Sequence, residues 1–162
     1  MSAWYLAKIK YTLQDEQGKQ KAVSEAYLLD AVSYTEAESR LYGYVASNIP
    51  DFQVTGITKM RLQEVFFVEE GAETWFKVKV QYILFDEKTQ KEKKVPYTML
   101  INATTPKEAY DLLDERLGRM QDYVITDINL TTILEVLPYE SELEEKIRTG
   151  QLKPIEDVVQ AN

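Results

Sequence analysis

The sequence predicts an α+β fold made of two copies of one ββαβ unit, each an antiparallel sheet with one helix on one face. Two observations carry this prediction: a strand-like segment that is written twice, and a helix start of the same kind after each copy. The segment WYLAKIKYTLQDE begins at Trp4, and WFKVKVQYILFDE begins at Trp75. Self-similarity of this length indicates an internal duplication, so we expect two related halves in a pseudo-twofold arrangement.

The two copies keep their spacing along the chain. Identical residues match at an offset of 71 in the first strand, 72 through the second strand and the helix, and 71 again in the third strand. The length changes fall where turns are expected, as loops tolerate insertions better than strands or helices do. The predicted boundaries are 1–70 for the first repeat, 71–137 for the second, and 138–162 for an acidic C-terminal tail.

The first strand of each copy alternates apolar and polar residues with a period of two, which predicts one face against the core and one face in solvent. Polar hairpin tips join these strands to second strands, expected at 21–31 and 93–103. Third strands are expected at 52–67 and 122–137. The expected inward residues are Tyr5, Ala7, Ile9, Tyr11 and Leu13 in the first copy and Phe76, Val78, Val80, Tyr82 and Leu84 in the second.

A capping box opens the helix of each copy. Ser33 with Glu36, and Thr105 with Glu108, have the spacing at which a hydroxyl caps the first turn and a glutamate reaches back. Pro106 adds a residue that is favoured at the first helical position. Apolar residues then recur at i, i+4 and i+8, which predicts one stripe against the sheet. These residues are Ala37, Leu41 and Val45 in the first copy and Ala109, Leu113 and Leu117 in the second.

Composition excludes several classes of site. The 162 residues include no cysteine and no histidine, which excludes disulfides, thiolate metal sites and Ser–His or Cys–His nucleophiles. The apolar runs are too short to span a bilayer and no leader segment is recognised, so we expect a cytoplasmic protein with no membrane partner. The six glycines form no phosphate-binding loop, and the twinned acidic pairs precede turns. We therefore expect no metal, no cofactor and no enzyme activity.

The residues also resemble a known family. The segments WYLAKIKY, YLLDAVSYTEAESR and WFKVKVQYILFDEKTQKEKK are similar to a family of small proteins from Bacteroidetes and phages that is known only as a domain of unknown function. The resemblance covers nearly the whole chain up to Leu137, and its most specific part is DAVSYTEAESR. It implies a bacterial or host cytoplasm, and it brings no activity, cofactor or catalytic residue.

The outward face of the two first strands is the predicted binding surface. In each copy a tryptophan is followed at i+4 by a lysine, with a further lysine beside them. Aromatic rings among cations are typical of single-stranded nucleic-acid sites, because bases stack on the rings and ammonium groups contact phosphates. We therefore expect a binding module for single-stranded DNA or RNA. The residues are Trp4, Lys8, Lys10, Trp75, Lys77 and Lys79, and a basic group in the second hairpin, Lys88, Lys91, Lys93 and Lys94, could extend the phosphate track.

A structural interpretation of the same residues stays open. Each tryptophan could instead start a strand and close the edge of the core, or lie beneath the C-terminal tail, since large aromatic side chains are usually buried. Lysines on an exposed strand also protect against edge-to-edge pairing. The hairpin lysines alternate with Glu87 and Glu92, as is typical of a solvated tip.

Protein–protein interaction is the alternative function. Tyrosine is frequent, with 11 in the chain, and Tyr42, Tyr44 and Tyr110 on the predicted helices are expected to be available for contacts. The segment from Pro138 to Asn162 carries six acidic and three basic side chains. It therefore contributes −3 to the formal net charge of −8. Within it, SELEEKIRTG predicts a short helix that packs on the body or docks on a partner. A homo-oligomer is also compatible with the sequence.

Overall fold

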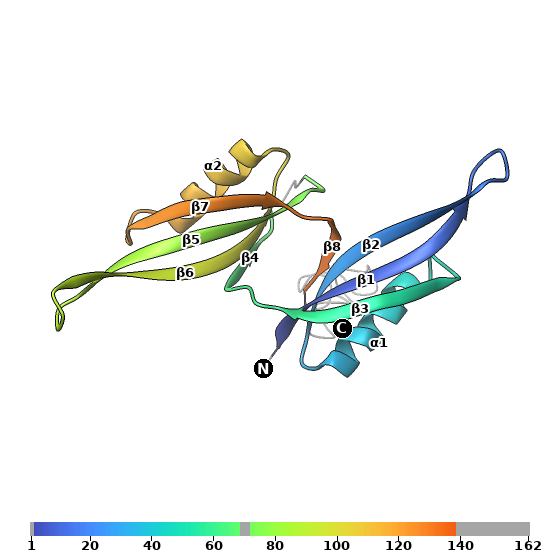
Figure 1. Cartoon of the computed structure of the whole chain (residues 1–162), viewed down its shortest axis with the longest axis horizontal. Coiled ribbons are helices and arrows are strands. Elements are labelled where there is room, and N and C mark those ends of the chain that lie inside the picture. Colours follow the sequence, from blue (N-terminus) through green and yellow to red (C-terminus); the bar gives the residue numbers. More distant parts are fainter. Residues whose placement is uncertain (1, 69–71, 139–162) are drawn as a thin grey trace, which may run out of the picture.

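The computed structural model describes residues 2–68 and 72–138. The predicted tail helix therefore lies outside the described residues. Two four-stranded sheets, each with one helix on one face, confirm the α+β class (Figure 1). The elements in chain order are β1 (Ala3–Gln14), β2 (Gln20–Ala31), α1 (Tyr34–Val45), β3 (Phe52–Met60), β4 (Glu64–Phe66), β5 (Trp75–Asp86), β6 (Lys91–Asn102), α2 (Pro106–Leu117), β7 (Tyr123–Leu130) and β8 (Ile133–Leu137).

The two halves exchange their last strands. The strand order is β3-β1-β2-β8 in the first sheet and β4-β6-β5-β7 in the second. Strand β8, from the second half, pairs in parallel with β2, and β4, from the first half, pairs in parallel with β6. Figure 1 shows both short strands in the middle of the molecule. Each half therefore completes the sheet of the other, while the predicted ancestral duplication stays a prediction.

The expectation of one continuous third strand in each half, at 52–67 and 122–137, is wrong. The first is divided into β3 and β4, and the second into β7 and β8, so each half has one strand more than predicted. In the second half, Thr131 forms the corner: its backbone N–H and its hydroxyl donate to the carbonyl oxygen of Trp75 at 3.0 and 2.8 Å. The break lets the second piece leave its own sheet and cross to the other.

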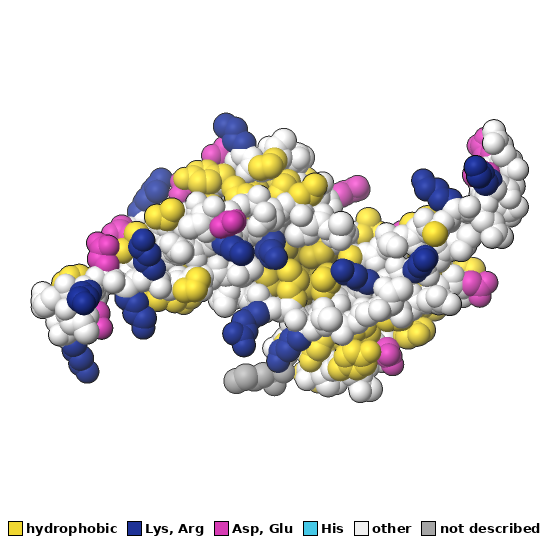
Figure 2. All heavy atoms as spheres, viewed as in Figure 1, with side chains coloured by type: hydrophobic (Ala, Val, Ile, Leu, Met, Phe, Trp, Pro, Cys, Tyr) yellow, Lys and Arg dark blue, Asp and Glu magenta, His cyan; other side chains and the backbone are white. Residues whose placement is uncertain are grey.

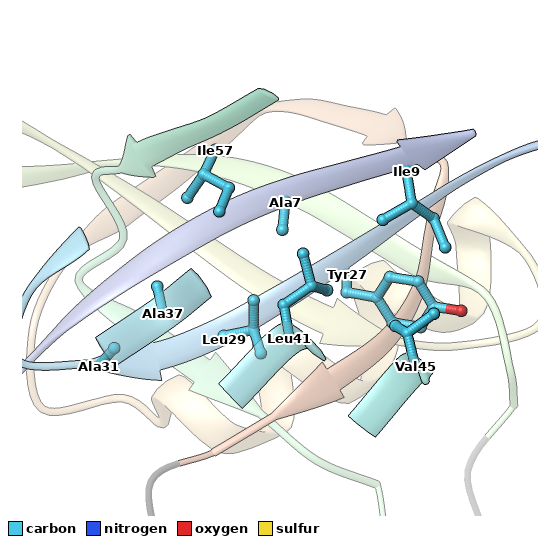
Figure 3. Packing of buried hydrophobic residues seen from close by; sticks show 9 residues of the cluster. All are labelled: Ala7, Ile9, Tyr27, Leu29, Ala31, Ala37, Leu41, Val45 and Ile57. Atoms are coloured by element: carbon cyan, nitrogen blue, oxygen red, sulfur yellow. The ribbon is translucent and has the colours of Figure 1, made fainter. Parts of the chain in front are cut away.

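Three apolar clusters make up the core. Under α1, the helix stripe of Ala37, Leu41 and Val45 packs on β1, β2 and β3 (Figure 3). A second cluster lies under α2, where Ala109 and Leu113 are fully buried. The third lies on the opposite faces of the sheets and draws residues from both halves. We call it the central cluster; it contains Leu28, Trp75, Leu100, Ile133 and Val136, with Trp4, Leu6, Met60, Leu62 and Val65 packed against it.

Both predicted helix caps are present. The Oγ of Ser33 accepts from the N–H of Glu36 at 3.1 Å, and the Oγ1 of Thr105 accepts from the N–H of Glu108 at 3.1 Å. Each glutamate carboxylate reaches back to the N–H of the residue before the cap, at 3.2 Å in both helices. That is one residue earlier than a capping box predicts.

The two hairpins extend as arms toward opposite ends of the molecule (Figure 1). Strand β3 pairs with β1 only as far as Tyr11, and β7 pairs with β5 only as far as Tyr82. Beyond these points each arm is a two-stranded ribbon. The prediction that Leu13 and Leu84 face the core is therefore wrong: they are 51% and 39% exposed, because no helix or third strand reaches them.

Candidate nucleic-acid interface

The helix-free faces of the two sheets carry the predicted strand lysines. Side chains alternate along β1 and β5, and the residues between these lysines are the buried ones that the helices cover. Lys8, Lys10 and Lys79 are exposed, and Lys77 is half-buried. Figure 2 shows Lys and Arg side chains around the middle of one face, where a hydrophobic area lies between the two sheets, with acidic side chains mostly nearer the ends and edges.

The two tryptophans lie in or against the central cluster. Trp75 is 6% exposed, and its ring meets Phe67 edge to face, with ring centroids 5.3 Å apart. Trp4 is half-buried against the same cluster. A base cannot stack on the covered ring of Trp75 in this structure. Both tryptophans lie where the two sheets meet. This is the position expected if each tryptophan closes the edge of the core rather than stacking on a base.

A β-bulge follows one lysine in each sheet. The register of β1 with β3 shifts directly after Lys8, and the register of β5 with β7 shifts directly after Lys79. The extra residues are Thr55 and Thr126, whose hydroxyls donate to the carbonyl oxygens of Lys8 and Lys79 at 3.2 and 3.3 Å. Bulges increase the local twist and redirect neighbouring side chains. The two lysines therefore hold corresponding positions on correspondingly twisted sheets.

The charges around the two lysines differ. Lys8 lies opposite Gly56, which leaves its side chain unobstructed on that side, whereas Lys79 lies opposite Asp127. In the part of the chain that the structure describes, ion pairs join Lys107 to Asp111 and Arg119 to Asp114, on or next to α2. Within that same part, the four strand lysines have no ion pair, so their ammonium groups are available to an anionic ligand.

The hairpin lysines divide between the two faces of the second arm. Lys94 pairs with Ile83 and therefore lies on the same face as Lys77 and Lys79. Lys93 pairs with Leu84, on the other face, and Lys88 and Lys91 lie at the tip. Only Lys94 extends the strand lysines along their own face.

Phe85 is an exposed aromatic residue near this track that sequence reasoning did not name. Alternation along β5 places it on the face of Lys79, and its side chain is 60% exposed. The period-two pattern that placed the lysines could have found it. Its counterpart in the first half, at an offset of 71, is Gln14. The first arm therefore has no aromatic ring at this position.

A polar hollow of about 620 Å³ adjoins Lys10 beside the first arm. It exists because β1 and β3 separate after Tyr11. At the corresponding place in the second half the loop residues just before β7 stay hydrogen-bonded to β5: the N–H of Ile83 donates to Asp122 O at 2.9 Å, and Gln121 Nε2 donates to Ile83 O at 3.1 Å. The lining is Lys10, Tyr11, Thr12, Gln14, Gln20, Pro50, Asp51, Phe52 and Gln53.

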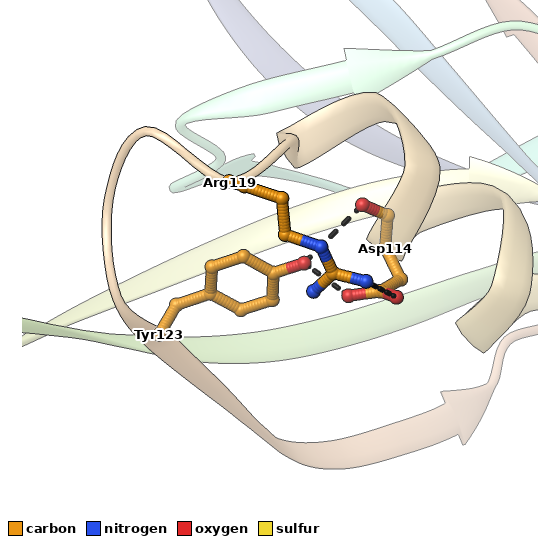
Figure 4. Close-up of polar contacts among 3 residues, drawn as sticks. All are labelled: Asp114, Arg119 and Tyr123. Atoms are coloured by element: carbon orange, nitrogen blue, oxygen red, sulfur yellow. Dashed lines mark hydrogen bonds and ion pairs between the residues drawn. The ribbon is translucent and has the colours of Figure 1, made fainter.

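Three buried or partly buried tyrosines donate hydrogen bonds to carboxylates. The hydroxyls of Tyr11 and Tyr27 donate to the two oxygens of Glu25, each at 2.5 Å. This hydrogen bond raises the pKa of Tyr11, and burial, followed by the same carboxylate, raises the pKa of Tyr27. In the second half, burial and then the hydrogen bond to Asp114 raise the pKa of Tyr123 to about 12 (Figure 4). These phenols stay neutral donors at physiological pH.

The helix tyrosines differ in their contacts. Tyr42 is 46% and Tyr110 45% exposed. The ring of Tyr42 packs on the ring of Phe52, with ring centroids 5.1 Å apart. The ring of Tyr44 meets that of Tyr27 edge to face, with centroids 5.8 Å apart. The rings of Tyr42 and Tyr44 are therefore partly engaged within the fold.

In the described part of the chain, no group of three or more His, Cys, Asp or Glu side chains could hold a metal ion. None of its helices has the length and apolar character needed to cross a bilayer.

Comparison with protein families matches residues 3–139 to the family described as Domain of unknown function (DUF4494). Comparison with curated proteins finds no match. Comparison with solved structures finds none either.

Proposed function

The chain belongs to this family of unknown function, and we propose that it is a non-enzymatic module that binds single-stranded nucleic acid along the helix-free faces of its two sheets. One observation carries the proposal. Lysines at matching positions of β1 and β5 are exposed on either side of the central cluster, and within the described residues they have no ion pair. Ammonium groups arranged in this way can neutralise successive phosphates of a strand.

The proposed contacts are made mainly with the phosphate backbone. Because Trp75 is covered, stacking on it is not part of the proposal, and Phe85 is the ring that can take one base beside Lys94, whose pairing partner Ile83 lies two residues from Phe85 on the same face. The chain is acidic overall, with a formal charge of −8, so attraction depends on the local concentration of lysines on these faces. We therefore expect binding that weakens steeply with salt, with a slope of log K against log[salt] of about −3 for four phosphate contacts.

Fluorescence anisotropy of a labelled single-stranded oligonucleotide tests the proposal. The charge-reversed pair Lys8→Glu and Lys79→Glu is expected to reduce affinity at low salt at least tenfold, because two cations become anions on the proposed path. The double variant Lys107→Glu, Arg116→Glu is the matched control, since it changes the net charge by the same amount and both residues are exposed on α2, away from the helix-free faces. Absence of binding by the native chain at low salt, or equal losses in the control and the charge-reversed variant, would contradict the proposal.

A protein-interaction role is the second candidate. The observation in its favour is the exposure of Tyr42 and Tyr110 on the two helices, at 46% and 45%, since tyrosine is enriched at interfaces. Affinity capture with the native chain and with the Tyr42→Ala, Tyr110→Ala double variant tests it. A partner that the native chain retains and the variant loses supports this role. If both retain the partner equally, Tyr42 and Tyr110 are not part of the interface. The tail, the homo-oligomer and the cytoplasmic location stay predictions.

A further inference from the structure

We propose that the two halves of the chain recognise each other as separate molecules would, so that the covalent connection between them is dispensable once they have met. The outer edges of β2 and β6 are strand-docking sites in this proposal. Each takes the last strand of the other half in parallel orientation. The partner is thus the complementary half of this same chain, and the proposal is independent of the proposed nucleic-acid binding.

The first argument is the register of the exchanged strands. Val65 of β4 pairs with Leu100 of β6, and Val136 of β8 pairs with Leu28 of β2. These are matching positions of the internal repeat, at offsets of 71 and 72. Register is strongly specified where one face is buried, because a slip of one residue turns every side chain to the wrong face. The two docking sites therefore select their strands by the same apolar pattern.

The second argument is the set of polar contacts between the halves. The N–H of Gln63 donates to Thr98 O at 2.8 Å, and Gln63 Oε1 accepts from the N–H of Thr98 at 2.6 Å. The N–H of Val68 donates to Asn102 Oδ1 at 2.7 Å. Asn102 is 6% exposed, so this bond is shielded from water. None of these contacts needs an intact chain between residues 68 and 72.

Arg40 supplies a third set of contacts between the halves. Its guanidinium, on α1 in the first half, donates to the carbonyl oxygens of Leu137 at 3.4 Å and Pro138 at 3.2 Å in the second half. It also donates to the carbonyl oxygen of Asp30 at the end of β2. One side chain thus fastens the docked β8 to the strand on which it lies.

The central cluster supplies the apolar part of this interface. Leu28 from the first half and Leu100 from the second are both fully buried in it. A half without its complement leaves these side chains and the docking edge exposed, and exposed apolar area of this kind drives association. Separation of the halves therefore exposes apolar side chains to water and breaks the β2–β8 and β4–β6 strand pairs at the same time.

The experiment cuts the folded, full-length chain at a protease site inserted after Glu70. We expect both fragments to elute together at the size of the intact chain at about 1 µM, with the circular dichroism of the intact protein retained. Fragments that separate or unfold when the connection is cut overturn the proposal. The readout involves no nucleic acid, so failure here is distinct from failure of the proposed function.

Two variants locate the interface. Val65→Asp places a charge in the central cluster. The two fragments of this variant are expected to dissociate at concentrations at which the fragments of the native chain stay associated. The control is Val124→Asp, the same change at a 49% exposed position of β7. If Val65→Asp fails to fold, Gln63→Ala serves instead and is expected to raise the dissociation constant of the cut halves roughly tenfold. Equal dissociation of control and interface variants contradicts the assignment.

Discussion

Arg40 shows how one side chain can hold an element that is distant in sequence. Its guanidinium contacts carbonyl oxygens at the end of β2 and after the end of β8, elements that belong to different halves of the chain. Hydrogen bonds from a charged donor contribute more than neutral ones, about 1.5–3 kcal/mol each at most. At the corresponding position in the second half, 72 residues later, the chain has Leu112, which cannot make such contacts.

Arg40→Ala is therefore expected to lower the free energy of unfolding by about 1–3 kcal/mol, since partly buried carbonyl groups lose their donor. Arg40→Lys should recover part of the loss, because an ammonium group keeps the charge but lacks the planar fork of donors. Urea unfolding followed by circular dichroism measures both. An alanine variant as stable as the native chain would show that these contacts do not stabilise β8.

Tyr123 gives a residue-scale prediction about pH. Burial and Asp114 raise its pKa from 10.0 to about 12, so the folded state favours the neutral phenol. Stability from this group is fully present below pH 10 and is lost as the pH rises toward about 12. The stability difference between the native chain and Tyr123→Phe should therefore narrow across this window. Urea unfolding at a series of alkaline pH values measures the difference; a constant difference would contradict the assigned cause.

At the scale of elements, local sequence signals placed the helices and the long strands well. Ser33 and Thr105 begin their helices as predicted, because caps depend on residues within one turn. The division between β3 and β4 was not predictable in this way. The apolar pattern continues through both pieces, and the event that separates them is pairing with β6, about thirty residues further along the chain. The free arm beyond Tyr11 was missed for the same reason, since alternation does not reveal where a covering element stops.

The helix caps lead to a matched pair of variants. Ser33→Ala and Thr105→Ala should each lower the free energy of unfolding by about 1 kcal/mol, because each removes the acceptor of a helix N–H. Ser33→Asp is expected to keep most of the stability, since aspartate is also a favoured cap. Chemical denaturation of the single variants tests this. Loss in one helix alone would indicate that the caps are not equivalent.

At the scale of the whole molecule, the central cluster explains which part of the site could be predicted. Alternation along β1 and β5 was enough to place Lys8, Lys10, Lys77 and Lys79 opposite the buried face. The burial of Trp75 depends on a surface that exists only after the halves have met. A pattern within one strand carries no information about such a surface, which is why the sequence alone left both interpretations of the tryptophans open.

The exchange of strands also predicts one cooperative unfolding transition. Each sheet includes one strand from the other half of the chain, so neither half can complete its sheet alone. Leu100→Ala in the central cluster should lower the free energy of unfolding by about 2–5 kcal/mol and shift the whole transition. Far-ultraviolet circular dichroism and tryptophan fluorescence are expected to coincide, because Trp4 and Trp75 report on the junction of the halves. Two separate transitions would contradict this expectation.

The docking of β8 on β2 has a consequence for biosynthesis. Leu28 pairs with Val136, 108 residues later in the chain (136 − 28). A ribosome must therefore translate most of the protein before the first sheet can receive its last strand, and at about 5–20 residues per second this leaves an uncovered edge on the nascent chain for roughly 5–20 seconds. During that interval the open edge of β2 can pair with other strands, as unpaired strand edges in general can.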